Sequence, residues 1–305
     1  MLQELLKAIG FQIQVVQITP GPLHGTLRAD RACGGLLLQV TTNQCLCFQG
    51  DRDQNWLAIA LEQTDSLELH RVRGEAVGQC SIQGFNSNLT DSFWQVSLHS
   101  HSSILVLPLQ RVVDLITLDP SSGLQDVIDS ANIMQLAPDH FQALKHCLGS
   151  PAAAADQDQF DGLLLEIFST SEPQAIYGGE MHTDAALMRD LVAFGCSNPH
   201  APIRLADLGK TLLKSTSSIN KASRDQFGLT PLQLLKQIRL QQVQHTLLNP
   251  SRQSLLGARS IQGIASHYGF TARNHFARDY RLMFGESPSQ TLQRQSLCAP
   301  RQSCT

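Results

Sequence analysis

The 305-residue sequence predicts an α+β multidomain protein with a strand-rich N-terminal part, helices after it, and an all-α C-terminal part. Short apolar runs separated by Gly, Asn, Asp and Ser fill the first third of the chain, a pattern typical of strands. From about residue 109, apolar residues recur at helical spacing instead. Charge divides the chain as well. Residues 200–305 hold 14 Lys and Arg against 4 Asp and Glu, a net charge of +10, whereas the remainder holds 9 against 22, a net charge of −13.

Apolar segments of the N-terminal part are expected to form the strands of a meander or small barrel, because they follow one another at regular intervals with turn residues between them. The segments are residues 34–48, 56–61, 67–72, 76–82, 93–98 and 104–107. Residues 1–16 form a mixed amphipathic stretch without the charged-then-apolar order of a leader peptide.

Helices are expected after the strands, because the apolar residues there change to helical spacing. The expected helical segments are residues 109–118, 123–136, 140–147 and 162–168, with residues 185–194 leading into the C-terminal part. Two stretches between them, residues 151–161 and 171–180, are interpreted as loops.

The C-terminal part contains a short helix, a turn and a second helix with one polar face, and this pattern occurs twice. In the first copy, Leu205, Leu208 and Leu212 form the apolar stripe of the short helix, Ser215 caps the second helix and Gly228 ends it. The polar face of that second helix carries residues at positions i, i+3, i+4 and i+7, namely Ser217, Asn220, Lys221 and Arg224.

One long helix is expected to join the two copies. Thr230 and Pro231 open it, since the fixed φ of proline suits a first helical turn, and it runs to Leu248 before Asn249 and Pro250.

The second copy lies in residues 260–289. Ser260 caps its short helix, Gly269 stops that helix, and Thr271 is the expected cap of the next one. That helix presents Asn274, Arg278 and Arg281 on one face, flanked by Arg273 and His275.

Polar faces of this composition suit contact with DNA. Arg can donate two hydrogen bonds to guanine and Asn can pair with adenine in the major groove, which is wide enough to admit a helix. A solvated surface helix is the alternative interpretation of a single such face. The second copy of the pattern and the basic charge of this part favour the DNA-binding interpretation.

This part of the chain, from about residue 203 to 294, resembles the DNA-binding domain of the AraC/XylS family of transcription regulators. The resemblance rests on Gly269, Phe270, Phe276, Arg278, Tyr280, Phe284, Gly285, Ser287 and Pro288. It implies two helix-turn-helix modules whose recognition helices enter successive major grooves. It places base reading on Ser217, Asn220 and Lys221 in the first module and on Arg273, Asn274, His275 and Arg278 in the second. Ser223 departs from the family pattern, which has a bulky aromatic residue there, and predicts looser packing of the first module.

The same resemblance divides the chain into a sensor and dimerisation domain at residues 1–198, a DNA-binding domain at 199–295 and a polar tail at 296–305. It implies that the first part is a cupin-like barrel that binds a small effector or dimerises. The N-terminal pattern is also similar, more weakly, to the ethanolamine-operon regulator branch, through residues 21–27 among others. No residue marks a pocket for the ligands of that branch, so the effector stays unassigned.

Two features of the N-terminal part admit a binding interpretation. His99 and His101 are two apart on an expected strand, and so would share a face like a cupin metal pair. No further ligand accompanies them, because Asp114 lies in a helical stretch. We therefore expect no metal. Trp56 and Trp94 could line an apolar pocket, although buried tryptophans more often simply fill a core.

The sequence thus predicts a cytoplasmic, nucleoid-associated regulator that binds double-stranded DNA, contacts RNA polymerase, responds to an unknown small effector and forms a homodimer. Neither a cofactor nor an enzyme activity is expected, since no nucleophile or phosphate-binding motif is present. The chain has no apolar run long enough to cross a membrane. Two alternatives stay open: a non-specific architectural DNA-binding protein, and a cupin-type enzyme fused to a DNA-binding domain.

Overall fold

The computed structural model describes residues 6–7, 12–149, 157–170, 172–175, 181–200 and 204–298, with the side chains of 172–175, 273–274 and 296–298 left out. The chain divides into two compact units. The first comprises Met1–Val15 and His24–His182, and the second comprises Val16–Leu23 and Thr183–Thr305. The second unit therefore begins earlier than the expected boundary at residue 199, and it includes a short segment from near the N-terminus.

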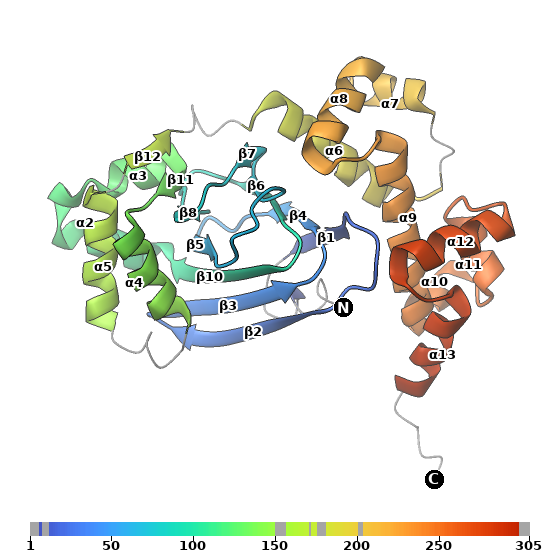
Figure 1. Cartoon of the computed structure of the whole chain (residues 1–305), viewed down its shortest axis with the longest axis horizontal. Helices are drawn as coiled ribbons and strands as arrows, with labels where there is room; N and C mark the ends of the chain where they lie inside the picture. Colours follow the sequence, from blue (N-terminus) through green and yellow to red (C-terminus); the bar gives the residue numbers. More distant parts are fainter. Residues whose placement is uncertain are drawn as a thin grey trace, which may run out of the picture. The chain divides into compact units, whose positions relative to one another are not determined.

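The first unit is built on two antiparallel sheets (Figure 1). The five-stranded sheet has the order β1 (Ile13–Gln17), β4 (Leu46–Asp51), β9 (Asp91–Val96), β6 (Arg71–Val72) and β7 (Glu75–Ala76). The seven-stranded sheet has the order β12 (Glu172–Ala175), β11 (Ala131–Gln135), β8 (Ser81–Gln83), β5 (Trp56–Glu62), β10 (Ser100–Pro108), β3 (Gly35–Thr42) and β2 (Gly25–Ala32).

Side chains alternate between the two faces of the larger sheet, as the pleat of a strand requires. Along β10, Leu105 and Leu107 are completely buried in the hydrophobic core. Leu105 lies opposite Leu37 of β3 and Ile59 of β5, and Leu107 lies opposite Leu57 of β5. The intervening residues of β10 point to the other face, where they line a cavity. One face of this sheet thus packs into the hydrophobic core, and the other face lines the cavity.

Helices cover the core face of the larger sheet (Figure 1). They are α2 (Leu109–Leu118), α3 (Leu124–Ser130), α4 (Pro138–Gly149) and α5 (Gln157–Thr170). Val112, Leu144 and Ile167 bring the apolar stripes of three of these helices into one cluster with the sheet. Phe85 and Phe168 meet edge to face there, with ring centroids 5.4 Å apart.

The second unit is helical apart from its N-terminal segment. Its helices are α6 (Thr183–Ser197), α7 (Leu205–Thr211), α8 (Thr216–Phe227), α9 (Pro231–Leu248), α10 (Pro250–Leu256), α11 (Ile261–His267), α12 (Arg273–Phe284) and α13 (Pro288–Cys298). The long helix α9 packs against α6 and α8 near its start and against α11, α12 and α13 further along. Thr230 and Gln233 form a capping box at its start, and Pro231 occupies the first turn, as expected.

Residues 16–23 are bound into the second unit by backbone and side-chain contacts. The Gln17 N–H donates to Gln241 Oε1 at 2.7 Å, and Gln241 Nε2 donates back to the Gln17 carbonyl at 2.9 Å. The Gly21 N–H donates to the carbonyl of Met283 at 2.9 Å, and Ile18 is buried. This segment contains the last two residues of β1 and leads to β2, so β1 continues from the first unit into the second.

Several expected elements of the first unit were wrong. Residues 131–135, expected as helix, form strand β11. The segment is buried on both faces and shows no alternation that would separate strand from helix. Strands β1 and β2 were not expected, and β2 is mostly exposed and polar, so it lacks apolar alternation. Residues 157–161 and 172–175, expected as loops, belong to α5 and β12. The rest of the two expected loops, residues 151–156, 171 and 176–180, lies outside the described residues.

Candidate DNA-binding surface and internal cavity

Helix α8 is held at both ends by the residues expected to do so. The Ser215 hydroxyl accepts a hydrogen bond from the Ser218 N–H at 3.0 Å, and Gly228 adopts a left-handed φ of 68° at the C-terminal cap. Ile219 and Phe227 are buried on the inner face of the helix. The inner face therefore fixes the rotation of α8 and determines which residues face outward.

The outer face of α8 carries the residues expected to contact DNA. Ser217, Lys221 and Arg224 are exposed, and Asn220 is half-buried with its amide donating to the Thr216 carbonyl at 3.1 Å. Lys221 lies 4.0 Å from the carboxylate of Asp225, an exposed pair of small energetic weight.

Ser223, where the family resemblance implies an aromatic residue, is completely buried. Its hydroxyl donates to the carbonyl of Leu229 at 2.8 Å. This bond ties α8 to the turn that follows it.

Helix α12 presents its apolar face to a second core formed with α9 and α11. Phe276, Tyr280 and Met283 are buried there, and the Tyr280 hydroxyl lies 2.9 Å from Thr291 Oγ1. Burial raises the pKa of Tyr280, which keeps the hydroxyl neutral. The expected cap Thr271 is wrong, since Ala272 is the N-cap and no side chain caps this helix. The preceding helix α11 is capped by Ser260, as expected.

The opposite face of α12 is polar and open. His275, Arg278 and Arg281 are exposed, whereas the side chains of Arg273 and Asn274 lie outside the described set. Asp279 borders this face and forms an ion pair with Lys236 of α9, with Nζ and Oδ2 3.0 Å apart. Its Oδ1 lies 3.8 Å from Nη2 of Arg278. The Arg278 guanidinium therefore has only a weak internal partner.

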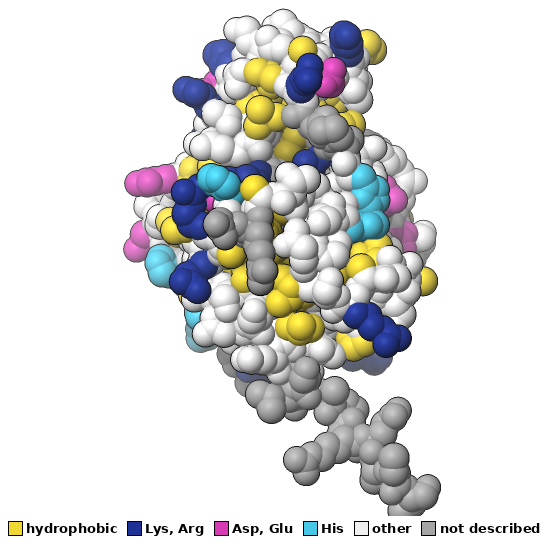
Figure 2. All heavy atoms as spheres, turned by 90° about the vertical axis from the view of Figure 1, so that its right-hand side faces the viewer, with side chains coloured by type: hydrophobic (Ala, Val, Ile, Leu, Met, Phe, Trp, Pro, Cys, Tyr) yellow, Lys and Arg dark blue, Asp and Glu magenta, His cyan; other side chains and the backbone are white. Residues whose placement is uncertain are grey.

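Figure 2 shows how charged side chains are distributed on one face of the molecule. Lys and Arg side chains lie in several separate places on this face, and Asp and Glu side chains appear near the top and at both edges. The second unit contains all of residues 200–305, whose net charge of +10 suits contact with phosphates.

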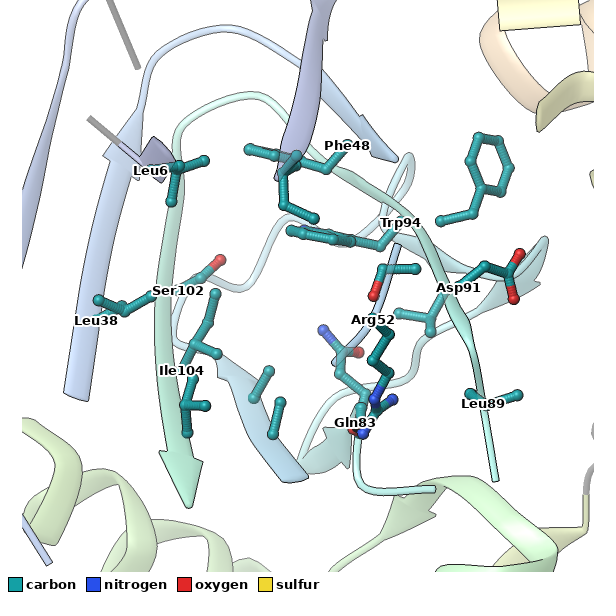
Figure 3. A pocket seen from close by; sticks show the side chains of 18 of the residues that line it. Leu6, Leu38, Phe48, Arg52, Gln83, Leu89, Asp91, Trp94, Ser102 and Ile104 are labelled. Atoms are coloured by element: carbon teal, nitrogen blue, oxygen red, sulfur yellow. Dashed lines mark hydrogen bonds between the residues drawn. The ribbon is translucent and has the colours of Figure 1, made fainter. Parts of the chain in front are cut away.

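The first unit encloses a cavity of about 760 Å³ between its two sheets (Figure 3). Leu38 and Val40 of β3, Ala60 of β5 and Ile104 of β10 form one wall. The opposite wall comes from β4 and β9 and includes a stacked aromatic pair, Phe48 and Trp94, with ring centroids 4.7 Å apart. A cavity of this size is within the range of small-molecule sites.

Both tryptophans of the chain line this cavity, so the pocket interpretation of Trp56 and Trp94 is the one that the geometry supports. The histidine pair is not supported. His99 lies in a turn with a φ of 55°, one residue before strand β10, which contains His101. Among the described residues, no group of three or more His, Cys, Asp or Glu is arranged to hold a metal ion.

A buried polar cluster lies beside the cavity. Glu62 accepts hydrogen bonds from the hydroxyls of Ser100 and Ser102 at 2.6 and 2.7 Å, and from the His101 N–H at 2.7 Å. Burial raises the pKa of Glu62, but these bonds outweigh it and the net shift is downward. Burial lowers the pKa of His70, against the opposing effect of Glu62, so the imidazole is neutral.

This cluster orients a side chain that lines the cavity. His70 Nδ1 faces Glu62 at 3.7 Å, and its Nε2 lies 2.7 Å from Gln83 Nε2. With the proton on Nδ1, directed toward the carboxylate, Nε2 accepts from the Gln83 amide. Gln83 Oε1 is then buried, and it has no hydrogen-bond partner among the described residues.

Charged side chains meet at the same end of the cavity. Arg73 and Asp91 form an ion pair at 2.6 Å, and Arg52 donates from Nη2 to the Gly84 carbonyl at 2.6 Å. In Figure 3 the side chains of Arg52 and Gln83 lie together at one end. Nothing in the sequence marked these residues, because they lie in or directly after different strands, which only the sheet pairing brings together.

Comparison with known proteins identifies the second unit more closely than the first. A family model described as a helix-turn-helix domain matches residues 208–294. The chain is 26% identical over 186 residues to the probable thc operon regulatory protein of Rhodococcus erythropolis, covering 61% of this chain and 51% of that one. It is 34% identical over 102 residues to the XylDLEGF operon transcriptional activator 2 of Pseudomonas putida, covering 33% and 62%. The chain thus spans less than two thirds of either relative.

Among solved structures, the chain is similar to a probable AraC family transcriptional regulator from Rhodopseudomonas palustris CGA009. The identity is 33%, the match covers 36% of this chain and 97% of that one, and the TM-score is 0.32. Within the described residues, no helix combines the length and apolar character needed to cross a membrane.

Proposed function

We propose that this chain, whose C-terminal domain is a helix-turn-helix domain of the AraC/XylS family, is a sequence-specific transcription regulator controlled by a small effector. The observation that carries the proposal is the repeated architecture on one helix. Helices α8 and α12 each bury an apolar face and leave a polar face open, and α9 packs against both.

In this proposal the two open faces read bases in neighbouring major grooves. Arg278 of α12 and Asn220 of α8 carry the side-chain types that pair with guanine and adenine. Lys221, Arg224 and Arg281 supply further charge for contact with bases or phosphates, and Ser217 and His275 complete the two surfaces. Arg273 and Asn274 belong to the same proposed set. Two reading surfaces on one rigid helix favour half-sites about one helical turn apart.

The cavity of the first unit is the proposed effector site. Effector binding changes the strands around the cavity, and β1 leads directly into residues 16–23, which are hydrogen-bonded to α9 and α12. A ligand that binds one state of these strands better than another shifts the DNA-binding equilibrium accordingly. Homodimerisation, contact with RNA polymerase and a place on the nucleoid in the cytoplasm belong to the same proposal. Transcriptional activation is the proposed direction, because the Pseudomonas relatives are named activators.

Selection of bound fragments from random DNA by the full-length protein tests this function. We expect enrichment of one motif with two half-sites about a helical turn apart. Enrichment of a single half-site would restrict base reading to one module. Salt-sensitive binding without any enriched motif would instead indicate an architectural DNA-binding protein and would overturn the proposal.

A further inference from the structure

Arg52 provides the cavity with a positive charge. It directly follows β4, and its backbone N–H donates to the Thr90 carbonyl at 2.9 Å, which fixes the start of the side chain. Of its guanidinium N–H groups, Nη2 donates to the Gly84 carbonyl. No carboxylate oxygen of a described residue lies within 4.0 Å of this guanidinium, whereas Arg73 has Asp91 at 2.6 Å.

The direction of the pKa shift of Arg52 agrees with its lack of a close carboxylate among the described residues. Burial and, to a lesser extent, the charge of Arg73 lower the pKa of Arg52 to about 10, against the opposing effect of Asp91. Since Asp91 already pairs with Arg73, it offsets the charge of Arg52 only in part. A bound anion next to Arg52 would neutralise the remaining positive charge at this end of the cavity.

A buried polar group at the same end also lacks a partner. Gln83 is 5% exposed, lines the cavity, and has no hydrogen-bond partner for Oε1 within the described part of the chain. Buried side-chain oxygens are normally satisfied, so an unsatisfied acceptor beside a cavity marks a position that needs a hydrogen-bond donor. Gln83 therefore marks this end of the cavity as polar. Because an ionised carboxylate cannot donate to Gln83 Oε1, the charge of Arg52 is the feature that argues for an anion.

The rest of the cavity is apolar. Leu38, Val40 and Ile104 form one wall, and Phe48 and Trp94 form the other. These walls favour binding of a hydrocarbon group, because burying apolar surface is favourable, but they offer no hydrogen bonds. A ligand that satisfies both regions is amphipathic, with one polar end.

We infer that the cavity takes an amphipathic organic anion, an aliphatic or aromatic carboxylate whose acid group pairs with Arg52 and whose apolar body lies between the two sheets. This inference deepens the proposed function and rests on it, since it names the chemical class of the effector. Two further carboxylates, Asp51 and Asp53, also line the cavity, but both are exposed. They are the groups that would attract an amine instead, so a cationic ligand is the alternative outcome of the test.

Three probes of equal chain length and different head group separate these outcomes: octanoate, octan-1-ol and octylamine. Tryptophan fluorescence of the full-length protein reports binding, because Trp56 and Trp94 both line the cavity and the chain has no other tryptophan. At pH 7.5 we expect octanoate to bind roughly tenfold or more tightly than octan-1-ol, as a charge-assisted hydrogen bond predicts.

Two substitutions of Arg52 test the assignment. Arg52→Gln should remove the preference for octanoate while changing octan-1-ol affinity less than about threefold, and Arg52→Lys should retain much of the preference because it keeps the charge. Ala60→Phe, which fills the wall of the cavity, should weaken all three probes together. Circular dichroism of each variant verifies that it is folded.

Equal affinity for the three probes, tightest binding of octylamine, or no binding at millimolar concentrations would each overturn the anion assignment. An unchanged octanoate preference in Arg52→Gln would overturn the role of Arg52. None of these results touches the DNA-binding proposal, because motif selection from random DNA measures that function without any ligand.

Discussion

Replacing Arg278 by Ala tests whether the exposed face of α12 reads bases. The Arg278 side chain is 66% exposed and its only described ion-pair partner, Asp279, is 3.8 Å away. Its removal should therefore change the free energy of unfolding by no more than about 0.5 kcal/mol. A bidentate contact to one guanine contributes about 1–3 kcal/mol of discrimination, so affinity for the cognate site should fall roughly 5- to 150-fold.

The assay is fluorescence anisotropy with labelled duplexes that carry the selected site and each single-base variant of it. In the wild-type protein, one base pair in the second half-site should strongly prefer guanine, and in Arg278→Ala that preference should disappear. Arg259→Ala is the matched control, because Arg259 is also exposed and lies outside both recognition helices. It should leave all base preferences unchanged.

A different pattern would refute base reading by Arg278. If the variant lost affinity equally for every sequence, and the dependence of affinity on salt weakened by about one phosphate contact, then Arg278 would bind the backbone.

Three further predictions concern stability. Gly285→Ala should destabilise the second unit by about 1 kcal/mol or more, because φ is 71° and an added Cβ would lie 3.1 Å from Pro22. Urea unfolding followed by circular dichroism at 222 nm measures this, and the control Gly228→Ala, with φ of 68° and open space around it, should cost less. Equal losses in the two variants would show that the approach to Pro22 does not contribute. Tyr280→Phe should cost about 1–2 kcal/mol by loss of the buried bond to Thr291, and an unchanged midpoint would contradict that contact. The first unit should lose stability as pH falls below about 6.5, because His70 then takes up a proton in the unfolded state but stays neutral in the folded, buried site. A further loss is expected below about 4.5, because the lowered pKa of Glu62 acts in the same direction. Tryptophan fluorescence reports the unfolding of this unit, and a His70→Gln variant that kept the full loss of stability between pH 7 and 5 would exclude His70 as the cause.

The second unit was largely predictable, because local signals determine its elements. Ser215, Gly228, Ser260 and Gly269 mark helix ends through their own hydrogen bonds or backbone conformation, and the structure places them there. Thr271 failed because the helix starts one residue later and has no side-chain cap. The short helix α10 was missed, since Asn249 both ends α9 and caps α10.

The cavity could not be predicted in the same way. Its walls alternate with core residues along β3, β5 and β10, so apolar side chains on both faces of these strands look alike in the sequence. Arg52, His70 and Gln83 come together only through long-range strand pairing. The two tryptophans were the available signal, and their residue type alone does not distinguish a cavity wall from a core.

The most direct test of the central claim is the ratio of affinities for the selected site and for a scrambled duplex of equal length, measured with the full-length protein at physiological salt. Sequence-specific reading by both modules predicts a ratio of roughly 10³ or more, reduced by substitutions on either α8 or α12. A ratio within about threefold at every salt concentration would contradict the account, because binding would then rest on phosphate charge alone.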